Sequence, residues 1–255
     1  MCLCSKILIS YNNALLQKDV RKLLAGNILS NLDNKLKNRI KIGLLLGLTL
    51  IATLIWKWVF YSTIIVAFLY SMYEINSKVK EKNNSNIHYL LIIPPLAYLL
   101  LGIIAASTLR IYFIEEFMYA VFATVINDVF AFFGGKKFGK NKLAPIISPN
   151  KTQEGALTGI IGVTIFTIIY GVIFFPQYRT ITGIIIGLTL LGLFTASAGI
   201  CGDLLESWYK RKIGVKDLGW ILGEHGGIID RIDSHILALT FLTLYFHILN
   251  LITIP

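Results

Sequence analysis

Charged and glycine residues are concentrated in one polar segment, residues 201–233, which reads CGDLLESWYKRKIGVKDLGWILGEHGGIIDRID. The segment mixes Lys and Arg with Asp and Glu, and it lies between two long apolar runs. Cations beside a carboxylate cluster suit a polyphosphate and the divalent metal that accompanies it. This segment is therefore predicted to carry the chemistry of the protein.

The spacing within the segment suggests some partners and leaves others open. On a helix, Asp203 and Glu206 lie three residues apart and share a face. Lys210 follows Glu206 by four residues, so a Glu–Lys surface pair is the simple alternative for those two. Further along, Asp217 and Asp230 stand on either side of a glycine-rich stretch. Acidic groups separated by a glycine turn can converge on one divalent cation, but spacing alone leaves this open.

A second carboxylate lies inside an apolar run, in VINDVFAFFGG. Asp128 is expected to face a polar cavity or a partner, because an ionisable group in a membrane helix is costly to leave alone. One alternative is a hydrogen-bonded Asn127–Asp128 pair. The other is a carboxylate that lines a headgroup or metal site.

The loop that follows, residues 134–155, is rich in glycine and lysine. Its lysines can meet phosphate as point charges. Thr152 or Ser148 is expected to cap the next helix, whose free N–H groups would then point at an anion. The pattern GxxxxGK[ST] is absent, which argues against a P-loop nucleotidase. Taken alone, such a lysine-rich loop is more often only a signal of membrane orientation.

The elements that position these residues are membrane helices. Of 255 residues, 55% are hydrophobic and only 15% are charged, with a mean hydropathy of +0.69, which is typical of a polytopic all-α membrane protein. We expect about seven spans. They are 42–56, 58–73, 89–106, 117–133, 156–175, 181–200 and 234–254. The first two are short and separated only by Lys57, so a helical hairpin that does not fully cross is an alternative.

Two of these spans carry small residues four positions apart. The pairs are Gly155 with Gly159, Gly183 with Gly187, and Gly192 with Ala196. Such pairs let helix backbones approach closely in lipid, so these helices are expected inside the bundle.

The distribution of cations predicts the orientation. Of the 24 Lys and Arg residues, all but Lys57, Arg110 and Arg179 fall in segments that are cytoplasmic if the N-terminus is inside. We therefore expect a multi-pass protein of the cell (inner) membrane, with its active site facing the cytoplasm. The net charge of +10 does not indicate nucleic-acid binding, because the cations are scattered over short loops.

Two parts are expected along the chain. Residues 1–37 form an N-terminal cytoplasmic extension, and residues 38–255 form the transmembrane domain with its catalytic segment at 201–233. The three cysteines do not make a disulfide framework, and reduced thiols are expected.

Taken in order, these motifs resemble the phosphatidate cytidylyltransferase (CDP-diacylglycerol synthase) family. That family shows GDLxES, KR, GVKD, HGG and DRxD, which stand here at 202–207, 210–211, 214–217, 225–227 and 230–233. An upstream element close to SPKKTxEG stands at 148–155, and Asp128 precedes a GxxxGK-like stretch. The likeness covers most of the chain from about Asn38 onward. Two departures are Gly223–Glu224, where the family has Pro-Gly before HGG, and Asn150, where it has Lys.

The resemblance implies that CTP and phosphatidate are converted to CDP-diacylglycerol and pyrophosphate in phospholipid biosynthesis. It implies Mg²⁺ bound by Asp203 and Asp230, with a second cation for which K⁺ is a candidate. The substrates and the bilayer are the expected partners, and a homodimer is compatible with the likeness. Catalytic roles fall on Asp203, Asp230, Lys210, Arg211 and His225. Substrate-binding roles fall on Asp128, Ser148, Lys151, Thr152, Lys216, Asp217, Gly226, Gly227 and Arg231.

Two other functions remain as alternatives. A CTP-dependent polyprenol or dolichol kinase would share a cytoplasmic nucleotide site and a lipid acceptor, but it would release CDP instead of pyrophosphate. A transporter would use Asp128 and the charged segment as an ion path. Transporters are often built from two repeats with interrupted helices, and no such repeat is visible in this sequence.

Overall fold

The computed structural model describes residues 41–82, 88–175, 178, 180–221 and 226–253, which belong to two compact units. The described part of the first unit, residues 1–56, is the apolar helix Lys41–Ile55. The second unit, residues 57–255, holds the other described elements. The expected boundary between residues 37 and 38 lies outside the described residues, so the N-terminal extension stays a prediction.

Six helices of the second unit are long and apolar enough to cross a membrane. The protein is therefore a polytopic all-α membrane protein, as predicted. The expected first span, 42–56, is the shorter helix Lys41–Ile55, so about seven spans become six long helices and one short one among the described residues. The long helices are α2 (Lys57–Lys82), α3 (His88–Tyr112), α4 (Ile114–Phe138), α5 (Gln153–Phe174), α6 (Thr189–Lys212) and α7 (Ile229–Thr253).

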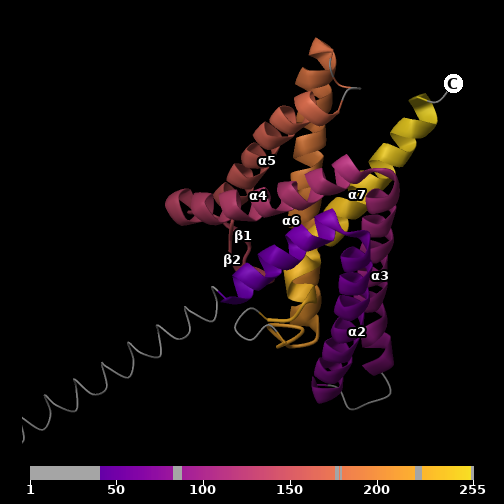
Figure 1. Ribbon diagram of the computed structural model, residues 1–255. Helices are drawn as coiled ribbons and strands as arrows, with labels where there is room; N and C mark the ends of the chain where they lie inside the picture. The colour runs from indigo at the N-terminus through magenta and orange to yellow at the C-terminus, as the bar shows by residue number, and fades with distance from the viewer. Residues whose placement is uncertain (1–40, 83–87, 176–177, 179, 222–225, 254–255) are drawn as a thin grey trace, which may run out of the picture. The chain divides into compact units, whose positions relative to one another are not determined.

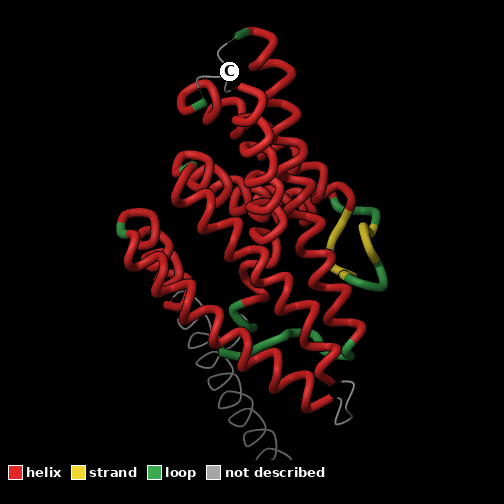
Figure 2. The backbone as a smooth tube through the Cα atoms, turned by 90° about the vertical axis from the view of Figure 1, so that its right-hand side faces the viewer, coloured by secondary structure: helices red, strands yellow, loops and turns green. Residues whose placement is uncertain are grey.

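The helices of the second unit form a bundle in which each helix packs on at least one other (Figures 1 and 2). The most extensive contact joins α4 to α5, and α6 packs on both α5 and α7. Helix α3 packs on α7 and also on α2. A π-helical turn, η2 (Gly183–Leu188), leads into α6 and was not expected from the sequence. Helices α6 and α7 carry the predicted catalytic segment, so their contact places its two ends together.

Glycines allow the close contacts between these helices. Gly159 of α5 faces the Asn127 side chain of α4, and Gly162 faces the ring of Phe130. Gly192 of α6 lies against the backbone of Thr164 in α5, and Ala196 one turn later is buried. The prediction of close helix packing is confirmed for the pairs Gly155–Gly159 and Gly192–Ala196. Gly183 and Gly187 are half-buried and face Tyr178 instead of another helix.

Gly192→Ala is expected to destabilise the contact between α5 and α6. The added Cβ would lie 2.7 Å from the Thr164 Cα, a backbone atom that cannot rotate away. Overpacking costs about 1–3 kcal/mol, which exceeds the gain of about 1 kcal/mol in helix propensity. Thermal unfolding in detergent measures the change. Gly47→Ala is the control, since its Cβ would meet nothing within 4 Å. Equal melting temperatures for wild type and Gly192→Ala would contradict the packing.

The glycine- and lysine-rich loop after α4 forms a short hairpin, where the sequence suggested only an irregular loop. Strands β1 (Lys142–Ala144) and β2 (Ser148–Thr152) pair antiparallel, with Lys142 opposite Thr152. Glu154 anchors its base, since its carboxylate accepts the backbone N–H groups of Lys140 and Asn141. Thr152 caps α5 by accepting the N–H of Gly155, which confirms one of the two expected caps.

Candidate functional site

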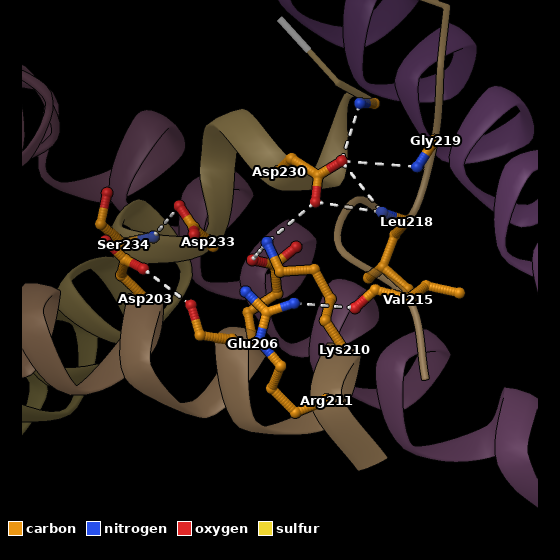
Figure 3. Close-up of polar contacts among 12 residues, drawn as sticks. Asp203, Glu206, Lys210, Arg211, Val215, Leu218, Gly219, Asp230, Asp233 and Ser234 are labelled. Atoms are coloured by element: carbon orange, nitrogen blue, oxygen red, sulfur yellow. Dashed lines mark hydrogen bonds and ion pairs between the residues drawn. The ribbon is translucent and has the colours of Figure 1, made fainter. Parts of the chain in front are cut away.

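Polar residues of α6 contact the start of α7 on one side and the hairpin on the other. Figure 3 shows the contacts between α6, α7 and the loop that joins them. Gly202 makes the contact between α6 and α7 possible, because a Cβ there would lie 2.6 Å from the backbone carbonyl oxygen of Asp233. The glycine of the GDLxES motif is therefore required by packing, because it lets α7 approach the helix that carries Asp203. The same carbonyl accepts the hydroxyl of Tyr98 from α3, at 2.8 Å.

Asp203 is joined to the hairpin. Its Oδ2 forms an ion pair with Lys151 of β2, and its Oδ1 accepts the hydroxyl of Ser207, one turn along α6, at 3.3 Å. Both members of the ion pair keep about a quarter of their side-chain surface exposed, at 27% for Lys151 and 26% for Asp203. The tertiary fold thus unites two residues that the sequence placed in separate motifs, and it leaves them accessible.

A cavity of about 530 Å³ opens beside this ion pair. Asp128, Lys136 and Lys151 contribute charge to its wall, while Phe132, Leu143 and Ile200 contribute apolar surface. Four elements, α4, the hairpin, α5 and α6, supply the lining. Such a mixture of a few polar groups with apolar walls is typical of ligand sites, and it suits a molecule with an anionic head and an apolar tail.

Asn127 adds an amide oxygen, a potential metal ligand, to the wall of this cavity. Its side chain is 3% exposed, and Oδ1 has no hydrogen-bond partner among the described residues. The alternative in which Asn127 and Asp128 satisfy each other therefore gains no support. Asp128 lines the cavity with Asp203, and its role at a headgroup or metal site stays a prediction.

Lys210 lies at the centre of a buried ionic cluster. Its Nζ is 2.6 Å from Oε2 of Glu206 and 3.0 Å from Oδ1 of Asp230. Glu206 is 2% exposed, so the alternative of a Glu–Lys surface pair is wrong. Buried charges are kept only where they are paired, and here the pairing joins α6 to the start of α7. In this arrangement Lys210 connects α6 to α7, and its ammonium already pairs with two carboxylates.

The carboxylate of Asp230 is occupied on both oxygens. It accepts the backbone N–H groups of Leu218, at 3.1 and 3.2 Å, of Gly219, at 3.4 Å, and of Gly227, at 2.7 Å, besides the ammonium of Lys210. Figure 3 shows this set on one side of the Glu206–Lys210 pair and Asp203 on the other. The two aspartates therefore share a neighbourhood but have separate partners.

These contacts test how well the residues fit a divalent metal. Within the described residues, no three His, Cys, Asp or Glu side chains are grouped closely enough to form a metal site. The oxygen donors that fit best are those on the cavity wall, Asp203, Asp128 and Asn127, because Mg²⁺ prefers one or two carboxylates plus substrate oxygens. Asp230 fits less well in this conformation, since its oxygens already accept N–H groups.

The remaining predicted residues occupy varied positions. Arg211 connects the hairpin to the loop after α6, since Nε donates to the carbonyl of Ile147 and Nη1 to that of Val215, each at 3.2 Å. Lys216, Asp217 and Arg231 are exposed, and Ser148 lies half-buried at the start of β2. Gly226 adopts a φ of 79°, a left-handed conformation that favours glycine. His225 and Glu224 lie outside the described residues, so their roles stay predictions.

Sequence analysis missed Glu74 of α2. Its carboxylate is 1% exposed and accepts the backbone N–H groups of Trp220 and Ile221, at 2.8 and 2.7 Å. A signal was available, because Glu74 is a lone acid directly after the expected apolar span 58–73. Glu206 was seen but not assigned to the site.

Two kinds of comparison relate this sequence to known proteins. The sequence profile described as the cytidylyltransferase family matches residues 44–249. The chain is 37% identical over 167 residues to a phosphatidate cytidylyltransferase of Aquifex aeolicus (strain VF5), covering 66% of this chain and 56% of that protein. It is 39% identical over 149 residues to one of Staphylococcus aureus (strain COL), covering 58% and 55%.

A further relative, the uncharacterized protein YnbB of Escherichia coli (strain K12), is 40% identical over 117 residues, which cover 46% of this chain and 37% of that protein. The chain thus spans little more than half the length of the first curated relatives that it matches.

Proposed function

The chain belongs to the cytidylyltransferase family, and on that premise we propose that it transfers the cytidylyl group of CTP to phosphatidate. The products are CDP-diacylglycerol and pyrophosphate. The relatives named phosphatidate cytidylyltransferase support this choice of substrates. The observation that carries the proposal is the cavity in which Asp128, Asp203 and Lys151 stand beside apolar walls, because one substrate is a lipid with a phosphate headgroup.

The reaction needs no covalent enzyme intermediate. A phosphate oxygen of phosphatidate attacks the α-phosphorus of CTP, the bond to the β-phosphate oxygen breaks, and pyrophosphate leaves with that electron pair. Both reactants are anions, so catalysis consists of charge neutralisation and alignment. Lys151, at the cavity wall, is placed to attract a phosphate oxygen, and Asp203 holds Lys151 in place through their ion pair.

Mg²⁺ is the proposed cofactor, and a second cation such as K⁺ is proposed with it. Asp203, with Asp128 and Asn127 beside it, would hold the divalent ion at the cavity. When bound, it would neutralise charge on the triphosphate oxygens. Asp230 and Lys210 support the site from the buried side, where they join α6, α7 and the loop between them.

The site is proposed to face the cytoplasm of the cell membrane. Lys78 lies over the ring of Trp220 at 5.5 Å, and Arg211 reaches the hairpin, so three cation-rich segments lie at one end of the second unit. Such an excess of Lys and Arg marks the cytoplasmic side. A homodimer stays a proposal that cross-linking in membranes can test.

Product analysis tests the reaction. Purified protein incubated with labelled CTP and phosphatidate should release pyrophosphate and form a labelled liponucleotide in equal amounts. Release of CDP together with a phosphorylated lipid would instead identify a lipid kinase. The control omits phosphatidate, and no pyrophosphate should then appear.

Removal of divalent cations should stop the reaction reversibly. EDTA is expected to abolish liponucleotide formation, and excess Mg²⁺ should restore it, because two polyanions cannot approach without neutralisation. Restoration should be measured on the same protein sample, so that irreversible unfolding is distinguished from metal loss. Turnover that is indifferent to EDTA would contradict the metal assignment.

A further inference from the structure

We propose that Glu74 of α2 is a positioning residue that holds the loop between α6 and α7 in the shape that turnover requires. The inference rests on the proposed function, since that loop carries Lys216, Asp217 and Gly226, which are predicted to have substrate-binding roles. It adds a residue from a helix outside the family motifs found in the sequence.

The contacts of Glu74 reach both described sides of the loop. Oε1 accepts the N–H groups of Trp220, at 2.8 Å, and Ile221, at 2.7 Å. Oε2 accepts the N–H of Ile228, at 3.3 Å. A carboxylate that is 1% exposed needs such donors, and a carboxylate that lost its charge would hold them less strongly.

Glu74 and Asp230 accept hydrogen bonds from different backbone N–H groups of this loop. Asp230 accepts the N–H groups of Leu218, Gly219 and Gly227, whereas Glu74 accepts those of the residues next to them. The two carboxylates come from different helices, α7 and α2. Asp230 thus ties the loop to α7, and Glu74 ties it to α2.

Apolar contacts place Glu74 firmly against the loop. Ile75 and Val79, on the same helix, are buried in a cluster with Leu218 of the loop. The ring of Tyr73 contacts that of Trp220 edge-on, with centroids 6.0 Å apart. This part of α2 therefore packs against the loop, and the packing keeps the Glu74 carboxylate next to the loop backbone.

Two loop glycines match the carboxylate of Glu74. A Cβ on Gly219 would overlap the carboxylate, and a Cβ on Gly227 would lie 2.7 Å from its Oε2. Gly227 belongs to the HGG motif and has a substrate-binding role by the family resemblance. In the structure, its lack of a side chain also makes room for Glu74. A larger residue at either position must displace the glutamate or the loop.

The test combines backbone exchange with kinetics, using Glu74→Gln. The amide keeps the size of the side chain, but it loses the charge and turns an NH₂ group toward backbone N–H groups. Hydrogen–deuterium exchange should increase in peptides covering residues 218–228 and stay unchanged in α4 and α5. The kcat/KM for CTP should fall about 10-fold or more, because small misplacements of positioned groups have effects of this size. The KM for phosphatidate should stay the same.

Glu81→Gln is the matched control. Glu81 lies on the same helix, is exposed, and pairs with Lys78 at 2.9 Å. This variant should show wild-type exchange in residues 218–228 and wild-type kinetics. Glu74→Asp is the second variant, since it keeps the charge and withdraws the carboxylate by one methylene. It should recover part of the lost kcat/KM, and it replaces Glu74→Gln if that variant does not fold.

The outcomes separate this inference from the proposed function. Unchanged exchange in Glu74→Gln would overturn the anchoring, and increased exchange with unchanged kinetics would overturn the positioning role. Wild-type protein that forms no liponucleotide, with increased exchange in the variant, would overturn the proposed function while supporting the anchoring. Gly219→Ala adds a coupling test: its effect on exchange should be smaller in a Glu74→Ala background than in the wild type, and equal effects would contradict the contact.

Discussion

Asp203→Asn is expected to reduce liponucleotide formation about 100-fold or more while leaving the protein folded, since losses of this size follow removal of one preorganised charge-stabilising group. Asp203 lies on the cavity wall and is partly exposed. Asparagine has the same shape, and its carbonyl oxygen still accepts the hydroxyl of Ser207. What it loses is the negative charge that faces Lys151 and that would hold a cation.

Two measurements are needed to read this variant. Initial rates with CTP and phosphatidate give the loss of activity, and thermal unfolding in detergent should give a melting temperature close to that of the wild type, because exposed ion pairs contribute only about 0–1 kcal/mol. Glu115→Gln is the control, since Glu115 is exposed in the first turn of α4, whereas the cavity lies toward the other end of that helix. Near-normal turnover in Asp203→Asn would contradict the proposed role of Asp203 in the reaction.

Asp230→Asn is expected to lose both activity and stability. The change leaves Lys210 buried beside Glu206 alone and places an amide NH₂ among the backbone N–H groups of Leu218 and Gly227. Breaking a buried ionic cluster by removing one partner costs about 3–5 kcal/mol. The melting temperature should therefore fall markedly, and peptides covering residues 213–228 should exchange faster with solvent.

The control for this second variant concerns stability alone. Asp217→Asn changes an exposed carboxylate in the same loop, so its melting temperature should match that of the wild type. A stable Asp230→Asn protein that has lost activity would mean that the carboxylate acts mainly on substrate or metal. A variant that is both unstable and inactive is the result that the hydrogen bonds of Asp230 predict.

The contrast between the two aspartates could not be drawn from spacing. Asp203 and Asp230 have equal standing in the sequence motifs, and both were expected to bind the metal. Their surroundings differ because Asp230 follows a loop whose backbone N–H groups turn toward it, while Asp203 faces the hairpin. A loop with several glycines has many conformations available, and local sequence does not select among them.

Local pattern was sufficient for the membrane helices. A run of apolar residues long enough to cross the hydrocarbon core must be helical there, since every backbone group has to be hydrogen-bonded within the segment. Small residues at four-residue spacing also predicted the close helix contacts, which Gly159 and Gly192 make. The limits of the first span were uncertain because Lys57 interrupts the apolar run, and the described helix there is short.

The sequence by itself determined the class of fold and the family, because hydropathy and motif order are properties of neighbouring residues. Only the tertiary structure decided which charges are accessible and which are buried. Lys151 meets Asp203, and Glu74 meets Trp220, across long separations in the chain. Such pairings depend on how helices and loops pack, and the physical reason that they remain hidden in the sequence is that no periodicity or spacing connects residues so far apart.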